Sequence, residues 1–291
     1  MATKSLGNVT VTTVVELERP NFKAGNLLPQ LTPELVEENA DWLVPRHYDP
    51  ATDVLVMPVQ SFLVKTRHHT ILVDGCFGNA KHITRPSPEF SGLDEPWLER
   101  LAEAGAEPDD IDFVMCSHLH ADHIGWNTRL ENGRWVPTFP NAKYVFARSE
   151  WDFWQEMART GERPTEQIEE SVVPIVEAGQ SEMVEGAHEI EDGIMVMPLP
   201  GHTPGHMGVH IRASDGEAVL TGDMIHHPLQ VHYPDWTANA CADKALSHKT
   251  RTTFIRDYAD TGVYIVPAHF PAPVCGLIES AGDSFKWRFD E

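Results

Sequence analysis

A histidine-rich motif, HLHADH, constrains this chain more than any other segment, because it directly follows the apolar run 111–116, which predicts a short buried strand. Histidine and carboxylate are preferred ligands of zinc and similar divalent ions. The first two histidines, His118 and His120, lie two residues apart on an extended stretch, so they can point to the same side and share one ion. Asp122 and His123 fall where a helix would begin and can turn toward a second ion.

Three later strand ends offer further donors. His202 lies in the sequence PGHTPGH after an apolar run, Asp223 lies in TGD after another, and His269 ends the sequence IVPAH. Each turn contains glycine or proline, which allow a close backbone approach or stiffen the turn. Because an α/β sheet builds a site where several strand ends converge, we expect these donors to meet the HLHADH motif at one edge.

In this order, the motifs SHLHADH, PGHTPGH, TGD and PAH resemble those of the metallo-β-lactamase superfamily over roughly residues 9–280. The resemblance implies an αββα four-layer sandwich. It also implies that His118, His120 and His202 hold one metal, that Asp122, His123 and His269 hold the other, and that Asp223 bridges both. Asp74, which closes the strand 71–73, matches an aspartate of the family that is expected to support the ligand loops and not to coordinate.

Two departures refine this resemblance. The members that degrade antibiotics commonly use cysteine where this chain has Asp223, which favours the dinuclear hydrolases of the superfamily. Among these, the chain looks most like the lactonases that open acyl-homoserine lactones and like aryl-ester and phosphotriester hydrolases. The lactonases usually place a tyrosine three residues after the bridging aspartate, where this chain has His226. We expect His226 to donate a hydrogen bond to the developing oxyanion; the alternative is a surface histidine in the loop 226–233.

The implied chemistry is hydrolysis of an ester, lactone, amide or phosphoester. Two divalent ions about 3.5–4 Å apart lower the pKa of a shared water toward about 7 and create a hydroxide nucleophile. Asp223 is expected to orient this hydroxide and to pass its proton to the leaving group. The predicted catalytic residues are Asp122, Asp223 and His226. Zinc is the first expectation for both metals, and manganese, iron and cobalt are alternatives because these ligands do not specify the metal.

Aromatic residues between the ligand motifs predict an apolar substrate pocket. The candidate substrate-binding residues are Trp126, Trp151, Trp154, His227 and Phe22. Phe22 lies in an earlier loop and is expected to cover the site, with a dimer contact as the alternative. Trp126 follows the metal motif and is the best single candidate for a pocket wall. Trp151 and Trp154 lie three residues apart on a predicted helix, so the alternative is that they pack this helix onto the sandwich. His206 is expected to pack or hydrogen-bond behind the site.

Composition and charge exclude several classes of function. The 291 residues, 41% of them hydrophobic, can form one large domain, and the net charge of −22 disfavours binding to nucleic acid or anionic membranes. No run has the length of a signal peptide core or a membrane span. The cysteines lack paired spacing and are expected to be buried thiols, which suits a reducing cytoplasm. We therefore expect a small-molecule substrate, with a homodimer as a possibility.

The chain is expected to start with strands and to alternate strands and helices later. Residues 1–50 predict an N-terminal strand and a covering loop, and residues 126–190 predict a helical insertion over the site. Thr32 and Pro33 open a short helix, and the segment from Ser149 to Asp152 resembles a capping box at the start of another. The longest helical stretch is 242–259, before a final strand at 263–266.

Two other classes of function remain open at this point. The same fold hosts iron-dependent sulfur dioxygenases and di-iron oxygen reductases, but the reductases need an appended flavin domain, for which no length remains after His269. The dioxygenases use a smaller ligand set than this chain offers. A non-catalytic scaffold would be expected to have lost Asp223 or His269, and both are present.

Overall fold

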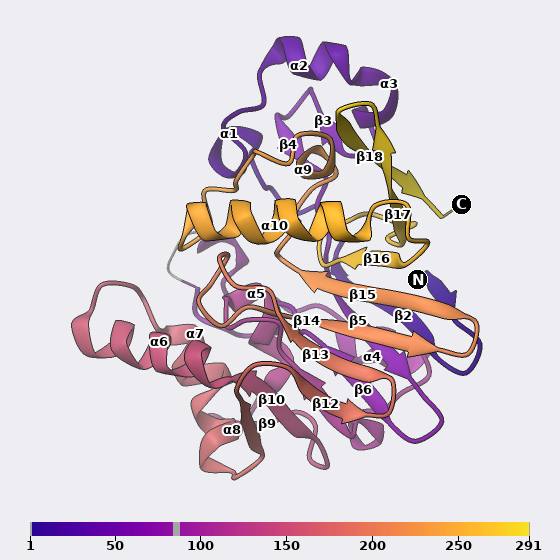
Figure 1. Cartoon of the computed structure of the whole chain (residues 1–291). Coiled ribbons are helices and arrows are strands. Elements are labelled where there is room, and N and C mark those ends of the chain that lie inside the picture. The colour runs from indigo at the N-terminus through magenta and orange to yellow at the C-terminus, as the bar shows by residue number, and fades with distance from the viewer. Residues whose placement is uncertain (1, 84–87, 291) are drawn as a thin grey trace.

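The computed structural model describes residues 2–83 and 88–290 and contains, within these residues, two seven-stranded sheets (Figure 1). In spatial order the first sheet consists of β1 (Thr3–Ser5), β2 (Thr10–Leu17), β5 (Val59–Lys65), β6 (Thr70–Val73), β7 (Phe113–Met115), β10 (Lys143–Ala147) and β11 (Ser181–Val184). The second consists of β12 (His188–Glu191), β13 (Ile194–Pro198), β14 (Met207–Ala213), β15 (Gly216–Gly222), β16 (Tyr264–Pro267), β17 (Gly276–Ala281) and β18 (Ser284–Phe289). Two small hairpins pair β3 (Tyr48–Asp49) with β4 (Val54–Leu55), and β8 (Thr128–Glu131) with β9 (Arg134–Pro137).

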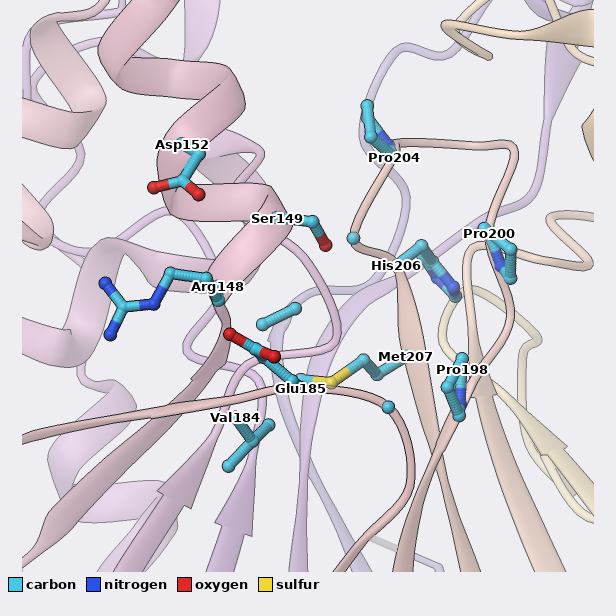
Figure 2. A pocket seen from close by; sticks show the side chains of 13 residues that line it. Arg148, Ser149, Asp152, Val184, Glu185, Pro198, Pro200, Pro204, His206 and Met207 are labelled. Carbon is cyan, nitrogen blue, oxygen red and sulfur yellow. The ribbon is translucent and has the colours of Figure 1, made fainter.

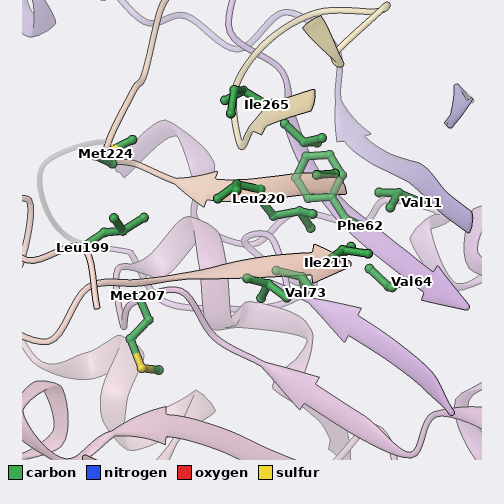
Figure 3. Close-up of a cluster of buried hydrophobic side chains, with 14 of the residues drawn as sticks. Val11, Phe62, Val64, Val73, Leu199, Met207, Ile211, Leu220, Met224 and Ile265 are labelled. Atoms are coloured by element: carbon green, nitrogen blue, oxygen red, sulfur yellow. The ribbon is translucent and has the colours of Figure 1, made fainter. Parts of the chain in front are cut away.

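Alternation along the strands explains why the two sheets pack face to face. In β5, Phe62 and Val64 are buried against residues of the second sheet, such as Ile211 and Leu220 (Figure 3). Leu63, between them, points to the other face and joins a second buried cluster. Strands buried on both faces are typical of a sheet covered by a sheet on one side and by helices on the other.

Helices cover the outer faces of both sheets and complete the αββα sandwich (Figure 1). The α-helices are α1 (Ala24–Leu27), α2 (Pro33–Glu38), α3 (Ala40–Leu43), α4 (Trp97–Glu103), α5 (Ala121–Ile124), α6 (Arg148–Thr160), α7 (Glu166–Ser171), α8 (Val173–Glu177), α9 (Leu229–His232) and α10 (Lys244–Tyr258), and the short 3-10 turns are η1 (Pro88–Phe90), η2 (Pro108–Asp110) and η3 (Gly125–Asn127). Trp97 and Leu101 of α4 pack on the outer face of the first sheet, and Phe254 and Ile255 of α10 pack on the second. None of the helices in the described ranges has the length and apolar content that a membrane span requires.

The strands that precede the candidate ligands run in the same direction within each sheet. In the first sheet, β6 and β7 are parallel neighbours. In the second, β15 and β16 are parallel, and β13 runs the same way as β15 because both are antiparallel to β14. Their carboxyl ends therefore meet at one edge of the sandwich, as the sequence predicted.

Several predicted elements are confirmed, and two predictions are wrong. The helix that opens after Thr32 is present, and the Thr32 side chain accepts a hydrogen bond from the Leu35 amide. The segment 126–190 is not a helical insertion as a whole, because β10 and β11 lie within it as strands of the first sheet. The capping box at Ser149 does not form, since α6 already begins at Arg148 and no side chain caps it. The four cysteines are buried and free, as expected.

A buried histidine in the N-terminal segment predicts acid sensitivity. His47 is fully buried, stacks on Phe289 with ring centroids 5.0 Å apart, and neither ring nitrogen has a hydrogen-bond partner within 2–83 or 88–290. Burial, together with the neighbouring His227, lowers its pKa to about 2. As the pH falls below the ordinary value of 6.5, the unfolded chain therefore takes up a proton that the folded chain does not. The free energy of unfolding should then fall by about 1.4 kcal/mol per pH unit from this group.

Replacing His47 with phenylalanine should remove this contribution while keeping an aromatic ring against Phe289. Urea unfolding of the metal-free proteins measures this contribution. Between about pH 7.5 and about pH 5, the free energy of unfolding of the wild type should fall by about 2 kcal/mol more than that of His47→Phe. The comparison uses the difference between the two pH values, so a constant packing cost of phenylalanine cancels. Equal losses in both proteins would contradict the assignment.

Candidate metal centre

Three imidazole nitrogens meet at one point at the edge of the sandwich. His118 Nε2 lies 2.9 Å from His120 Nδ1, and His202 Nε2 lies 3.1 Å from the first nitrogen and 2.9 Å from the second. Ligands bound at about 2.0–2.1 Å to a tetrahedral zinc ion are separated by about 3.3 Å. The triangle of nitrogens therefore has nearly the size that one shared ion imposes.

The carboxylate of Asp223 faces this triangle with one oxygen and a second group of imidazoles with the other. Its Oδ2 lies 3.4 Å from His202 Nε2 and 3.8 Å from His118 Nε2. Its Oδ1 lies 3.1 Å from His269 Nε2 and 3.4 Å from His123 Nε2. One carboxylate between two groups of imidazoles has the placement of a bridging ligand.

Asp122 completes the second group. Its Oδ2 is 3.6 Å from both His123 Nε2 and His269 Nε2. The seven residues predicted as ligands therefore form two adjacent groups, within each of which the ligand atoms lie no more than 4.8 Å apart: His118, His120, His202 and Asp223 in one, and Asp122, His123 and His269 in the other.

The donors fit divalent cations chemically as well as geometrically. His123 Nε2 and Asp223 Oδ1 are buried and have no hydrogen-bond partner among the described residues, a cost that a bound cation would relieve. Burial holds the pKa of both His118 and His202 well below the usual value, so these rings are neutral, as metal ligands must be. Burial opposes ionisation of Asp223, but the facing rings of His123 and His269 hold its pKa well below its usual value. Burial also opposes protonation of these two rings, but the Asp223 carboxylate raises the pKa of both, so a bound cation would replace their protons.

In two of the candidate ligand rings, His123 and His269, the nitrogen that faces away from the ligand groups, Nδ1, forms a hydrogen bond. Asp74 accepts from His123 Nδ1 at 2.8 Å, and it also accepts from the amide of Ser117 at 2.7 Å and from its hydroxyl at 2.9 Å. His269 Nδ1 donates to the carbonyl oxygen of Pro58 at 2.9 Å. A proton held at Nδ1 leaves Nε2 as the ligand atom. Asp74 thus supports the ligand loops without joining the ligand groups, as expected.

His226 lies beside the bridging carboxylate. Its Nε2 is 3.4 Å from Asp223 Oδ2, and its ring centroid is 4.8 Å from that of His202. The side chain is buried, so the alternative of a surface histidine is wrong. Neither ring nitrogen has a hydrogen-bond partner in the part of the chain that the structure describes. The ring is therefore placed where it can donate to a molecule bound at the paired ligand groups.

Two of the predicted substrate-binding residues lie near ligand rings. The ring centroid of Phe22 is 6.1 Å from that of His269 and 5.7 Å from that of Phe90. Trp154 meets His120 edge-on with centroids 6.0 Å apart. Trp151, on the same helix, is partly buried and packs against the buried cluster that contains Leu63 and Trp97, on the outer face of the first sheet. This contact agrees with the packing alternative. Phe22 and Trp154 are thus the predicted substrate-binding residues whose rings lie beside candidate ligands.

Trp126 and His227 lie in the interior and do not form the substrate wall that the sequence predicted. Trp126 is 4% exposed, stacks on Trp97 with centroids 5.1 Å apart, and donates its indole N–H to Glu16 at 2.7 Å. His227 is fully buried, and its Nε2 donates to the carbonyl oxygen of His47 at 2.8 Å. Both side chains are committed to packing and internal hydrogen bonds, which a local sequence pattern does not reveal.

His206 lies behind the ligand loops, in the place the sequence predicted. Its Nδ1 donates to the Leu199 carbonyl oxygen at 3.1 Å, and its Nε2 accepts from the Asp223 amide at 3.0 Å. It also lines a pocket of about 360 Å³ between the start of α6 and the loop around Pro200 (Figure 2). None of the seven candidate ligands lines this pocket, so a molecule held at the ligand groups would not lie there.

Two residues close to the ligands were not anticipated from the sequence. Glu150 is 1% exposed and binds the backbone of two ligand loops. Cys241 Sγ lies 3.6 Å from the outer nitrogen of His202. Glu150 has the sequence context of an ordinary helix residue, and Cys241 is far from any ligand motif along the chain, so no local signal identified either.

The αββα sandwich with paired histidine and aspartate groups at one edge defines a class of proteins with two adjacent metal sites. The family model described as the metallo-beta-lactamase superfamily matches residues 54–269, which is most of the chain. This chain therefore belongs to the metallo-beta-lactamase superfamily.

Curated relatives carry names from one branch of this superfamily. An N-acyl homoserine lactonase of a Bacillus species is 27% identical over 183 residues, which are 59% of this chain and 65% of that protein. The match thus spans about two thirds of that relative's length. The N-acyl homoserine lactonase AiiB of Agrobacterium fabrum is 23% identical over 264 residues, 85% of this chain and 92% of that protein.

Solved structures share the whole fold. The hydrolase AbOPH in the beta lactamase superfamily superposes with a TM-score of 0.81 at 22% identity, over 99% of this chain and 97% of that one. AidC, a dizinc quorum-quenching lactonase in complex with a homoserine product, superposes with a TM-score of 0.79 at 22% identity, over 100% and 97%. At this level of identity the likeness confirms the αββα sandwich.

Proposed function

We propose that this protein is a metal-dependent hydrolase that opens a lactone, or cleaves an ester, of a neutral and partly apolar small molecule. The observation that carries the proposal is the carboxylate of Asp223, whose two oxygens face two separate groups of imidazoles. The names of the relatives support the lactonase reading over the phosphotriester and aryl-ester reading. The dizinc lactonase AidC supports zinc as the first expectation, with manganese, iron and cobalt as alternatives.

The side chains of this chain divide the work of such a reaction. When bound, two divalent ions supply the ionisation of water near neutral pH and the polarisation of the ester carbonyl. Asp223 Oδ2 is oriented toward the space that it shares with His226 Nε2, so it can accept a proton from the attacking water and deliver it to the leaving oxygen. His226 donates a hydrogen bond to the oxygen that becomes negative.

The surroundings of the ligand groups suit a neutral substrate with an apolar part. Phe22 contributes an aromatic surface beside His269, close to Phe90. The net charge of −22 gives an exterior that repels polyanions. A small ester or lactone with an acyl or aryl group meets both conditions, whereas the charge of a nucleic acid conflicts with the second.

The proposal is tested by combining metal analysis with a panel of substrates. The zinc- or manganese-loaded protein is assayed on γ-lactones, δ-lactones, aryl esters and phosphotriesters, and the metal content is measured in parallel. We expect about two metal ions per chain and the highest kcat/KM on a lactone. Two bound metals without hydrolysis of any ester would overturn the proposal, and a single iron without ester hydrolysis would favour a dioxygenase instead.

Replacing His226 with phenylalanine tests the proposed oxyanion donor. Loss of one such donor typically lowers kcat about 10²–10³-fold. We expect this loss in His226→Phe with an unchanged metal content, because the ring occupies the same buried space without a donor. His248→Phe, at a partly exposed position on α10, serves as the control. A wild-type kcat for His226→Phe on every lactone and ester would remove this role.

A further inference from the structure

The carboxylate of Glu150 connects two loops that carry ligands of the same group. Glu150 lies in the first turn of α6 and is 1% exposed, although its residue type is normally solvated. Its Oε1 accepts a hydrogen bond from the amide of Leu119 at 3.2 Å, and its Oε2 accepts one from the amide of Gly205 at 3.0 Å. Leu119 stands between His118 and His120, and Gly205 follows His202 in the PGHTPGH loop.

The same carboxylate also fixes an aromatic side chain beside a ligand ring. Trp154, one turn further along α6, donates its indole N–H to Glu150 Oε1 at 3.2 Å. The Trp154 ring meets the His120 ring edge-on at 6.0 Å between centroids. Glu150 therefore holds the backbone of the ligand loops through the amides of Leu119 and Gly205, and it holds the Trp154 ring that packs against His120.

The close approach of α6 to the second loop depends on a glycine. A Cβ added at Gly205 would lie 2.5 Å from the Glu150 amide nitrogen and 2.7 Å from the Glu150 Cβ. Contacts this short do not occur between real side chains, so only glycine lets the loop reach the carboxylate. Burying a carboxylate costs free energy, which hydrogen bonds to its oxygens offset. Here both oxygens of Glu150 accept hydrogen bonds from groups around the imidazole triangle.

We propose that Glu150 is a positioning residue that locks the His118–His120 segment and the PGHTPGH loop together, and thereby sets the spacing of the three imidazoles. This inference rests on the proposed metal-dependent function, but it concerns metal binding and not hydrolysis. Glu150 touches no ligand atom and acts through the backbone amides of Leu119 and Gly205. The order of the ligand triangle thus depends on helix α6, which carries none of the ligands.

The test measures cobalt binding to the full chain after removal of metal. Substitutions of residues that orient metal ligands typically weaken affinity about 10–100-fold. We expect a loss of this size at one of two cobalt sites in Glu150→Gln, together with altered d–d absorption of that ion. The glutamine oxygen can still accept from Leu119 and Trp154, but its NH₂ group cannot accept from Gly205. Glu150→Asp, one methylene shorter, should show the same defect because it cannot span both loops.

Glu156→Gln is the matched control, since Glu156 lies on the same helix, pairs with Arg159 and is half-exposed. Wild-type cobalt affinity and absorption in folded Glu150→Gln and Glu150→Asp would overturn the positioning role. Lower unfolding stability of the metal-free variants without any change in cobalt binding would likewise assign Glu150 to the fold alone. If the wild type binds two cobalt ions but hydrolyses no lactone, the proposed function fails while the positioning role still stands.

Discussion

Replacing Asp223 with asparagine should lower kcat for lactone hydrolysis about 10³-fold or more and should remove one of two bound metal ions. An acid–base group of this kind contributes about 10²–10⁴-fold to the rate. Asparagine can bind one cation through its amide oxygen, but its NH₂ group then faces the other group of ligands and cannot replace the second carboxylate oxygen. Steady-state kinetics and elemental analysis of the same sample provide the two measurements.

Asp235→Asn is the control for the loss of one negative charge. The Asp235 side chain is 89% exposed and pairs with the partly exposed His248 at 3.8 Å, so the substitution should leave kcat and metal content unchanged. If Asp223→Asn retained two metals and more than about a tenth of the wild-type kcat, the bridging and proton-transfer roles of Asp223 would both be wrong.

Replacing Gly125 with alanine should lower the free energy of unfolding by about 3 kcal/mol or more. Gly125 lies two residues after His123, and its amide donates to the Cys76 carbonyl oxygen at 2.7 Å. An added Cβ would lie 1.7 Å from the carbonyl oxygen of Phe77 and 1.9 Å from its carbonyl carbon, which are backbone atoms. The loop after β6 and the loop after β7 would have to separate, because neither atom can move independently of its chain.

This separation should also disturb the second group of ligands. Asp74, which holds His123 Nδ1, lies in the first of the two loops, so metal content should fall along with stability. Gly25→Ala is the control, because an added Cβ there meets nothing within 4 Å. Denaturant unfolding followed by circular dichroism measures both variants. A Gly125→Ala protein with wild-type stability and two bound metals would show that the close packing of these loops is dispensable.

The local motifs predicted the ligands more reliably than they predicted the substrate pocket. HLHADH and the later strand ends hold their donors at fixed positions relative to short buried strands, so parallel strands bring them to one edge. The position of a tryptophan in the sequence does not by itself predict which residues its ring will contact. Trp126 follows the metal motif directly, yet it stacks on Trp97, far away along the chain, and donates to Glu16 in β2.

The start of helix α6 also shows that a local sequence pattern does not determine contacts between distant segments. The segment from Ser149 to Asp152 has the residues of a capping box, but the N-cap of α6 is Ala147, two residues before Ser149, and Glu150 turns inward to the ligand loops. A capping box is a local arrangement worth about 1 kcal/mol, which tertiary hydrogen bonds to a buried carboxylate can override. His226 was placed correctly near the site because its spacing from Asp223 is short and follows a strand end.

The amino-acid order by itself indicated the seven donors, because each lies within a few positions of the end of a short buried strand. The resemblance of these motifs to the metallo-β-lactamase superfamily implied the sandwich. Only the tertiary structure decided which aromatic rings face the ligands and which acid fixes their loops. Those choices depend on contacts between segments distant along the chain, such as Glu150 with Gly205 and Phe22 with His269. Their free energy comes from packing and desolvation, which no local window of sequence contains.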